Sequence, residues 1–161
     1  MREVVPMAGM AVSADPDCEL VTYALGSCLG VIVHDPAAGV GGLLHAMLPL
    51  STSDPERAAR NAAAYVDTGV PALFRACYEL GARKERMVVK VAGGASLAHA
   101  QEDDLFQIGA RNMVMLRKLL WKNGVLLRAT DVGGRTSRTV MLCVGTGVVT
   151  VKSGGEAYEL A

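Results

Sequence analysis

Short runs of Val, Leu and Ile, separated by Asp, Pro and Gly, dominate the first third of the chain. Apolar runs of about four to eight residues between turn-forming residues are typical of β-strands. The pattern predicts strands over Val4–Val12, Glu19–Leu25, Leu29–His34 and Gly42–Leu48. It returns later in the sequence and predicts further strands over Arg86–Val91, Val125–Thr130, Thr139–Val144 and Val148–Lys152.

Helical signals separate these groups of strands. In LSTSDPE, Ser53 or Asp54 is expected to cap a helix that has a proline near its start and continues through AARNAAAY. A second helix is expected over Val70–Leu80 and to end at Gly81, a suitable C-terminal cap. Pro71 then falls in the first turn of that helix, where a missing N–H does no harm.

A third helix is predicted over Ile108–Asn123, because Met113, Leu116 and Leu120 share one face and Gly124 follows as a stop signal. Strands outnumber helices and come in runs, which favours an α+β fold with a mixed sheet core and helices outside it. The chain has 161 residues and no long linker or repeat, so residues 1–161 are expected to form one domain.

Composition excludes several classes of function. Sixteen basic and 16 acidic residues give a net charge of zero, which argues against general attraction to nucleic acid or to an acidic membrane. No apolar stretch reaches the roughly 20 residues that span a bilayer, and MREVVPMAGMAV makes a poor signal peptide. Four widely spaced cysteines form no zinc motif, so we expect a reduced, cytoplasmic protein whose thiols are available for chemistry.

Cys28 and His45 stand out as a candidate catalytic pair. If the two strands around DPAAGV form a hairpin centred between Ala37 and Ala38, Gly30 faces His45 and Cys28 lies diagonal to it on the same face. Diagonal neighbours are about 7–8 Å apart at Cα, and their side chains can approach more closely. A shift of the turn by half a residue would put the two groups on opposite faces, so the spacing permits a pair without proving one.

The residues before the cysteine are suited to a reactive turn. Gly26 and Ser27 predict a sharp bend whose backbone N–H groups could receive a developing oxyanion. Gly30 opposite His45 would leave room for a substrate group. A neighbouring imidazolium can lower the pKa of a thiol to roughly 3.5–7.5.

A purely structural interpretation stays open for each of these residues. Cysteine in an apolar strand is more often a buried space-filler, and His45 could be a hydrogen-bonded core histidine. His34 is expected to pack at a strand end, and His99, before QEDD, is expected at the surface. The paired glycines 93–94 and 133–134 indicate tight turns, since neither segment has the lysine of a P-loop.

Six segments follow one another along the chain: TYALGSCLGVIVHD, GGLLHAMLP, VKVAGGASL, IGARN, DVGGRTSRTV and TGVV. With these motifs, nearly the whole sequence resembles the CheD family of chemoreceptor glutamine deamidases. TYALGSCLGVIVHD is similar to the family's T-x-G-L-G-S-C segment, and GGLLHAMLP to its G-G-x-x-H-x-M-L-P segment. VKVAGGASL, IGARN, DVGGRTSRTV and TGVV then follow in the family's order. One departure is Ala92, where related sequences often carry an aromatic residue.

The resemblance implies a Cys-His-Thr triad at Cys28, His45 and Thr22, a thioester intermediate and no metal or organic cofactor. It also implies a sheet sandwich with flanking helices, similar to toxin-type cysteine deamidases. The implied substrate is a glutamine on the cytoplasmic domain of a methyl-accepting chemotaxis receptor. Two alternatives remain: a regulatory adaptor that binds a CheC-type phosphatase of CheY, and a cysteine peptidase or transglutaminase-like enzyme.

Overall fold

The computed structural model of the protein describes residues 1–96 and 106–161. The strands in these ranges are β1 (Arg2–Val4), β2 (Met10–Ser13), β3 (Glu19–Leu25), β4 (Leu29–Asp35), β5 (Val40–Ala46), β6 (Val88–Gly93), β7 (Leu127–Val132), β8 (Arg138–Cys143), β9 (Val149–Ser153) and β10 (Glu156–Glu159). The α-helices are α1 (Pro55–Arg60), α2 (Val66–Glu79) and α3 (Ile108–Lys122). Short 3₁₀ turns cover Ser51–Ser53, Ala62–Ala64 and Lys84–Arg86.

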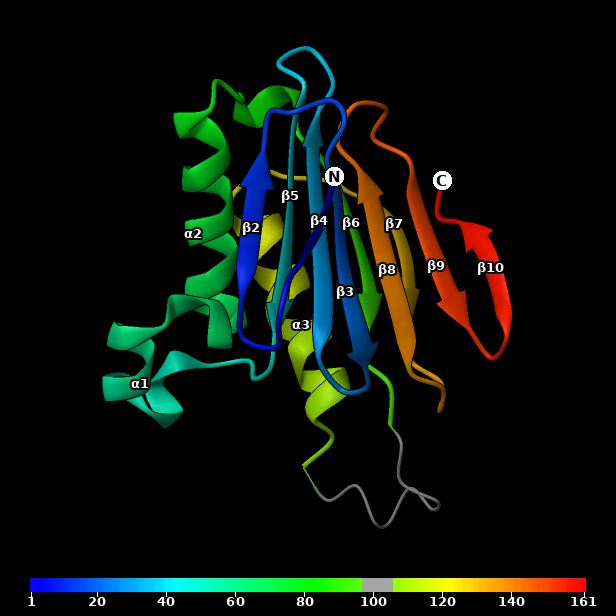
Figure 1. Ribbon diagram of the computed structural model, residues 1–161. Coiled ribbons are helices and arrows are strands. Elements are labelled where there is room, and N and C mark those ends of the chain that lie inside the picture. The colour runs from blue at the N-terminus through cyan, green and yellow to red at the C-terminus, as the bar shows by residue number, and fades with distance from the viewer. Residues whose placement is uncertain (97–105) are drawn as a thin grey trace.

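The strands form two packed sheets, with helices on the outer face of one of them (Figure 1). One sheet has the order β1-β3-β8-β9-β10 and the other β2-β5-β4-β6-β7. A first core lies between the sheets, and a second lies between the β5-β4-β6 surface and helices α2 and α3. This arrangement confirms the predicted α+β class with a sheet core and flanking helices.

Strand β4 is buried along its whole length because it contributes to both cores. Leu29, Val31 and Val33 belong to the core under the helices, whereas Cys28 and Ile32 belong to the core between the sheets. Successive side chains of a strand point to opposite faces, so a central strand covered on both sides is apolar throughout. The continuous apolar run LGVIV therefore marks the middle of the fold.

The predicted first strand, Val4–Val12, is wrong because the chain divides there between the two sheets. β1 pairs in parallel with β3, and β2 pairs antiparallel with β5. Between them, Pro6 has no N–H to give a ladder, and Ala8 adopts a left-handed conformation with φ of 59°. The sequence pattern also missed β10, an exposed edge strand without an apolar run.

Two helix predictions need correction as well. The first helix ends at Arg60, since Asn61 leaves helical geometry and its side chain accepts a hydrogen bond from Ala63 N. Helix α2 begins at Val66, so Pro71 lies inside it rather than in its first turn. Its start depends on a distant partner, because Val66 N donates to Leu48 O at 2.8 Å. Helix α3 is confirmed almost to the residue.

Asp35 fixes the turn of the β4–β5 hairpin. Its buried carboxylate accepts hydrogen bonds from the backbone N–H groups of Ala37, Ala38 and Arg83 and pairs with Arg86. Burial acts to raise the pKa of Asp35, but these hydrogen bonds outweigh it and the pKa is lowered. One carboxylate therefore ties the hairpin to the segment that enters β6.

We expect Asp35→Asn to lower the free energy of unfolding by about 2–3 kcal/mol at neutral pH, below the 3–5 kcal/mol of a fully buried pair. The expected loss is smaller than that of a fully buried pair because the Arg86 side chain is 36% exposed and can reach water. Because the folded-state pKa is lowered, this contribution exists above the unfolded value of about 3.9 and is lost as pH falls through the folded value. Urea titrations at pH 7 and at pH 3 measure it, with the exposed Asp17→Asn as control. An equal loss at both pH values would contradict the assignment.

Candidate active site

The hairpin register puts Cys28 and His45 on the same face of the sheet. Gly30 pairs with His45 and Asp35 with Val40, which is the predicted register. Cys28 lies two residues before Gly30, at the bend that enters β4, and packs in the core between the sheets. The alternative with the two groups on opposite faces is therefore wrong.

Thr22 joins His45 to the opposite sheet. The Thr22 Oγ1 lies 2.6 Å from His45 Nδ1 and 2.8 Å from the carbonyl oxygen of Val5. A hydroxyl has one hydrogen, and only a donor can pair with the carbonyl, so that hydrogen goes to Val5. The oxygen then accepts from Nδ1–H, which leaves the Nε2 of a neutral imidazole unprotonated. Within the described residues, Nε2 is buried and has no hydrogen-bond partner.

A β-bulge shapes the approach to the cysteine. Three steps on β3, from Thr22 to Leu25, oppose two steps on β8, from Val140 to Arg138. The extra residue is Ala24, which has a left-handed φ of 57°. This conformation costs a non-glycine residue about 1–2 kcal/mol, and the family segment T-x-G-L-G-S-C has glycine at this position. The bulge re-aims the chain into the Gly26–Cys28 bend.

The three carbonyl groups of that bend are all held by donors from other segments. Gly26 O accepts from Ala95 N at 2.9 Å, and Cys28 O accepts from Gly94 N at 2.9 Å. Between them, Ser27 O accepts from the side chain of Asn112 at 3.0 Å. The backbone around the thiol is therefore fixed on one side by the chain after β6 and on the other by α3.

The paired glycines form the predicted turns, and both turns brace the cysteine. Gly93 has φ of 116°, and a side chain there would collide with the carbonyl oxygen of Cys28. Gly133 N donates to Gly93 O at 3.0 Å, and the buried Arg138 donates to the carbonyl oxygens of both residues. Apart from the place of Arg138 in the GGRTSR segment, no sequence pattern indicates this role.

The sequence analysis predicted that Gly30 would leave room for a substrate group. The structure shows no open space there. A Cβ on Gly30 would lie 2.8 Å from Leu25 Cδ1, so the side chain of Leu25 fills that position. The glycine is needed for packing between β3 and β4.

The electrostatics favour a neutral pair in the resting protein. Burial raises the pKa of the Cys28 thiol above its ordinary value, although hydrogen bonding from its own backbone N–H acts in the opposite direction. Burial also lowers the pKa of His45. Both shifts run against the imidazolium that the sequence analysis expected to depress the thiol pKa, because desolvation disfavours both charged forms.

His34 does not belong to this pair. His34 is buried, with Nε2 2.9 Å from the Val144 carbonyl oxygen, which is the expected packing role. His99 and the segment 101–104 lie outside the described residues. Across residues 1–96 and 106–161, no three His, Cys, Asp or Glu side chains gather as metal ligands. No helix in the same ranges has the length and apolar character to cross a bilayer.

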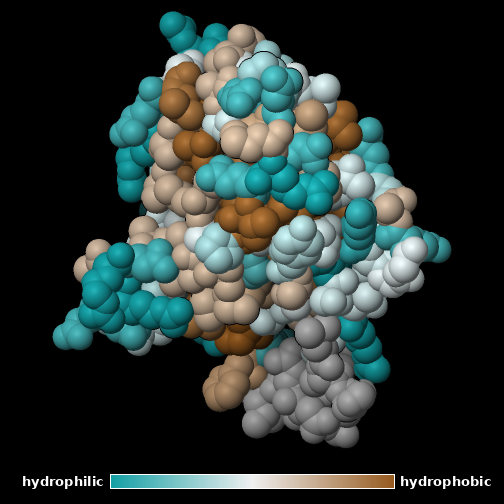
Figure 2. Space-filling view, in the orientation of Figure 1, coloured by the Kyte–Doolittle hydropathy of each residue, from teal (hydrophilic) through white to brown (hydrophobic). Residues whose placement is uncertain are grey.

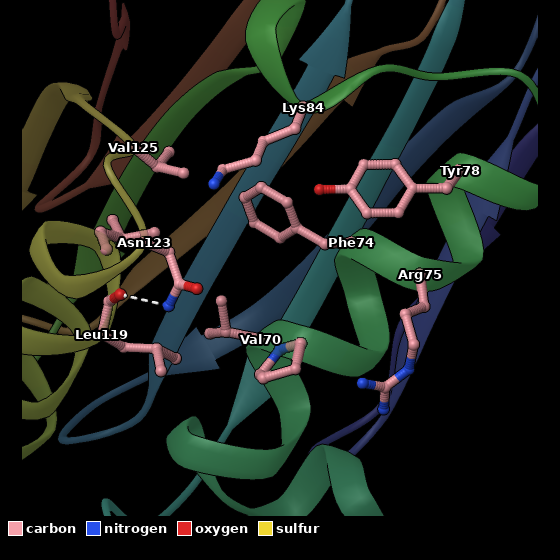
Figure 3. A pocket seen from close by; sticks show the side chains of 10 residues that line it. Val70, Phe74, Arg75, Tyr78, Lys84, Leu119, Asn123 and Val125 are labelled. Carbon is pink, nitrogen blue, oxygen red and sulfur yellow. Dashed lines mark hydrogen bonds between the residues drawn. The ribbon is translucent and has the colours of Figure 1, made fainter.

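The molecular surface has a separate hollow of about 220 Å³ between α2 and α3. Figure 3 shows Phe74 and Tyr78 of α2 facing Leu119 and Val125 across it. None of the candidate catalytic residues lines this hollow. Polar and apolar side chains are interspersed over the face in Figure 2, in keeping with the zero net charge.

Comparisons with known proteins agree with the motif pattern. Residues 47–153 match the family model described as CheD chemotactic sensory transduction. The chain belongs to the CheD family. It is 49% identical over 98% of both chains to the probable chemoreceptor glutamine deamidase CheD 1 of Syntrophus aciditrophicus. It is 45% identical, over 98% of this chain and 92% of the relative, to the probable chemoreceptor glutamine deamidase CheD of Solibacter usitatus. The similarly described CheD protein of Pyrococcus abyssi is 41% identical over 86% of this chain and 85% of its own.

Alkylation of Cys28 by a small reagent is expected to have a midpoint above the ordinary thiol value of about 8.5, because burial raises its pKa. A Cys143→Ser background removes the half-buried thiol, while Cys18 and Cys77 are fully buried. Burial and the charge of Asp35 also raise the pKa of Cys77 to about 12, so it stays unreactive. Mass spectrometry across pH gives the midpoint, and Cys28→Ser is the blank. A midpoint well below 8 would instead reveal a preformed thiolate–imidazolium pair.

Proposed function

We propose that this CheD-family protein converts glutamine side chains of chemoreceptors to glutamate, with Cys28 as nucleophile, His45 as base and Thr22 as the group that orients His45. The observation that carries the proposal is the buried chain from the Val5 carbonyl through Thr22 to His45 Nδ1. It leaves Nε2 as a proton acceptor on the face that also holds Cys28. The names of the relatives, chemoreceptor glutamine deamidases, support the same reaction.

The reaction begins from the neutral pair. His45 Nε2 takes the proton of the Cys28 thiol as the sulfur attacks the carboxamide carbon. The resulting imidazolium gives that proton to the departing nitrogen, so ammonia leaves and a thioester remains. His45 then activates a water that attacks the thioester, and the thiol is restored with glutamate as product. Every proton moves through one imidazole, so the scheme requires no metal or organic cofactor.

The bend before the cysteine supplies the donors for the developing oxyanion. In a trans peptide the C=O and N–H groups point in opposite directions. Because Ser27 O is bound to Asn112, the N–H of the same peptide, that of Cys28, points away from α3. This N–H also acts on the Cys28 thiol, which supports its placement beside the attacking sulfur. Together with the turn at Gly26 and Ser27, it is the candidate oxyanion site, where one donor is typically worth about 2.7–4 kcal/mol.

We infer that the substrate is a glutamine on the cytoplasmic domain of a methyl-accepting chemotaxis receptor, where deamidation creates a site for methylation. Because this substrate lies in the cytoplasm, we infer that the protein is cytoplasmic as well. The alternative function, a regulatory adaptor that binds a CheC-type phosphatase, would not need the thiol.

Incubation of a receptor cytoplasmic fragment with wild type and with Cys28→Ala tests the reaction. We expect ammonia release and the Gln-to-Glu mass change with wild type and none with Cys28→Ala, because the thioester needs the sulfur. Equal conversion by both proteins would refute the assignment. Peptide release or amine incorporation would instead favour a peptidase or a transglutaminase-like enzyme. A pull-down with Cys28→Ala separates the adaptor role, which does not need the thiol.

Thr22→Val is expected to lower kcat about ten- to a hundredfold, since the imidazole loses the hydroxyl that fixes its tautomer and direction. The change is nearly isosteric but leaves the buried Nδ1–H and the Val5 carbonyl without their partner. Thr22→Ser keeps the hydroxyl and is the matched control. Equal rates for the Val and Ser variants, at a temperature where both are folded, would exclude an orienting role for Thr22.

A further inference from the structure

Asn112 is a fully buried polar side chain that takes no part in the proton transfers or bond changes of the proposed mechanism. It lies in the first half of α3, in the IGARN segment, among the buried residues Met113, Leu116 and Leu120. Its Oδ1 is buried and has no partner within the described residues. A side chain at this position for packing alone would be apolar, because burial of a polar group without full hydrogen bonding is unfavourable.

The amide nitrogen of Asn112 connects the two segments that carry the candidate catalytic groups. Nδ2 donates to Ser27 O at 3.0 Å and to Met47 O at 3.1 Å. Ser27 immediately precedes Cys28. Met47 comes two residues after His45, directly beyond the end of β5. One side chain therefore uses both of its N–H groups to hold the nucleophile bend against the end of β5.

The backbone of α3 is itself seated close to this region. A Cβ on Gly109 would lie 2.5 Å from the carbonyl oxygen of Gly94, so α3 approaches the Gly93–Gly94 turn as closely as a glycine allows. Gly94 N in turn holds the carbonyl of Cys28. This close approach lets the short side chain of Asn112 reach both carbonyl groups.

We propose that Asn112 is a positioning residue that sets the relative placement of Cys28 and His45. Its bond to Ser27 O fixes the plane of the Ser27–Cys28 peptide, and with it the direction of the Cys28 N–H and the start of the cysteine side chain. Its bond to Met47 O fixes the strand end that carries His45. The inference rests on the proposed function for its kinetic consequence, but the placement of the two side chains can be measured without deamidation.

Asn112→Leu tests this role, because leucine has a similar shape and cannot donate to either carbonyl. We expect kcat for deamidation to fall about ten- to a hundredfold, with KM within about threefold, since small misplacement of reacting groups has effects of this size. Asn112→Ala, which removes both donors without adding bulk or charge, is the second variant if the first fails to fold. Leu120→Ala, a buried change on the same helix, controls for general destabilisation.

Alkylation of Cys28 gives a readout that does not depend on the substrate. Its rate is measured in a Cys143→Ser background for His45→Ala, Asn112→Leu and the double variant, at a temperature where circular dichroism shows all of them folded. We expect Asn112→Leu to slow alkylation and to have no further effect once His45 is absent, because the asparagine acts through the pairing of the two groups. An unchanged rate in Asn112→Leu, or an equal effect with and without His45, would overturn the proposal. If wild type fails to deamidate, the proposed function falls, and the alkylation series still decides the role of Asn112.

Discussion

The buried hydrogen bond between Thr22 and His45 is the central interaction of the candidate site, because it crosses the interface between the two sheets. Thr22 lies on β3 of one sheet and His45 on β5 of the other. The hydroxyl also donates to Val5, just after β1, so the tautomer of the imidazole is set by the backbone of the facing sheet. The packing of the sandwich thereby determines which ring nitrogen faces the cysteine side.

Desolvation favours the neutral protonation states of Cys28 and His45. A thiol and an imidazole in a dry interface are both more stable neutral than charged, which is the direction of both pKa shifts. The chemistry proposed for this family member therefore transfers a proton as the sulfur attacks, instead of starting from a stored thiolate. A neutral buried thiol is also less exposed to oxidation than a thiolate, because reactivity follows thiolate character.

The rigidity of the cysteine bend comes from segments distant in the sequence. The turn at Gly93 and Gly94, the side chain of Asn112 and the buried Arg138 all converge on the backbone of residues 26–28 or on its immediate support. Several of the ordered motifs that resemble the family, AGGAS, IGARN and GGRTSR, supply these groups. Motifs that looked independent along the chain are thus parts of one scaffold around the thiol.

Local sequence patterns were enough to predict the β4–β5 hairpin, helix α3 with its glycine stop, the sheet-rich class and two options for the relation of Cys28 to His45. These follow from periodicity and turn chemistry over a few neighbouring residues. Long-range contacts selected one of those options, divided β1 from β2 and set the start of α2 at Val66. They also supply the hydrogen-bond partners of Thr22 and Asn112. The reason is physical: strand pairing across sheets, burial and the pKa shifts that burial causes are set by atoms far away along the chain, which no local pattern contains.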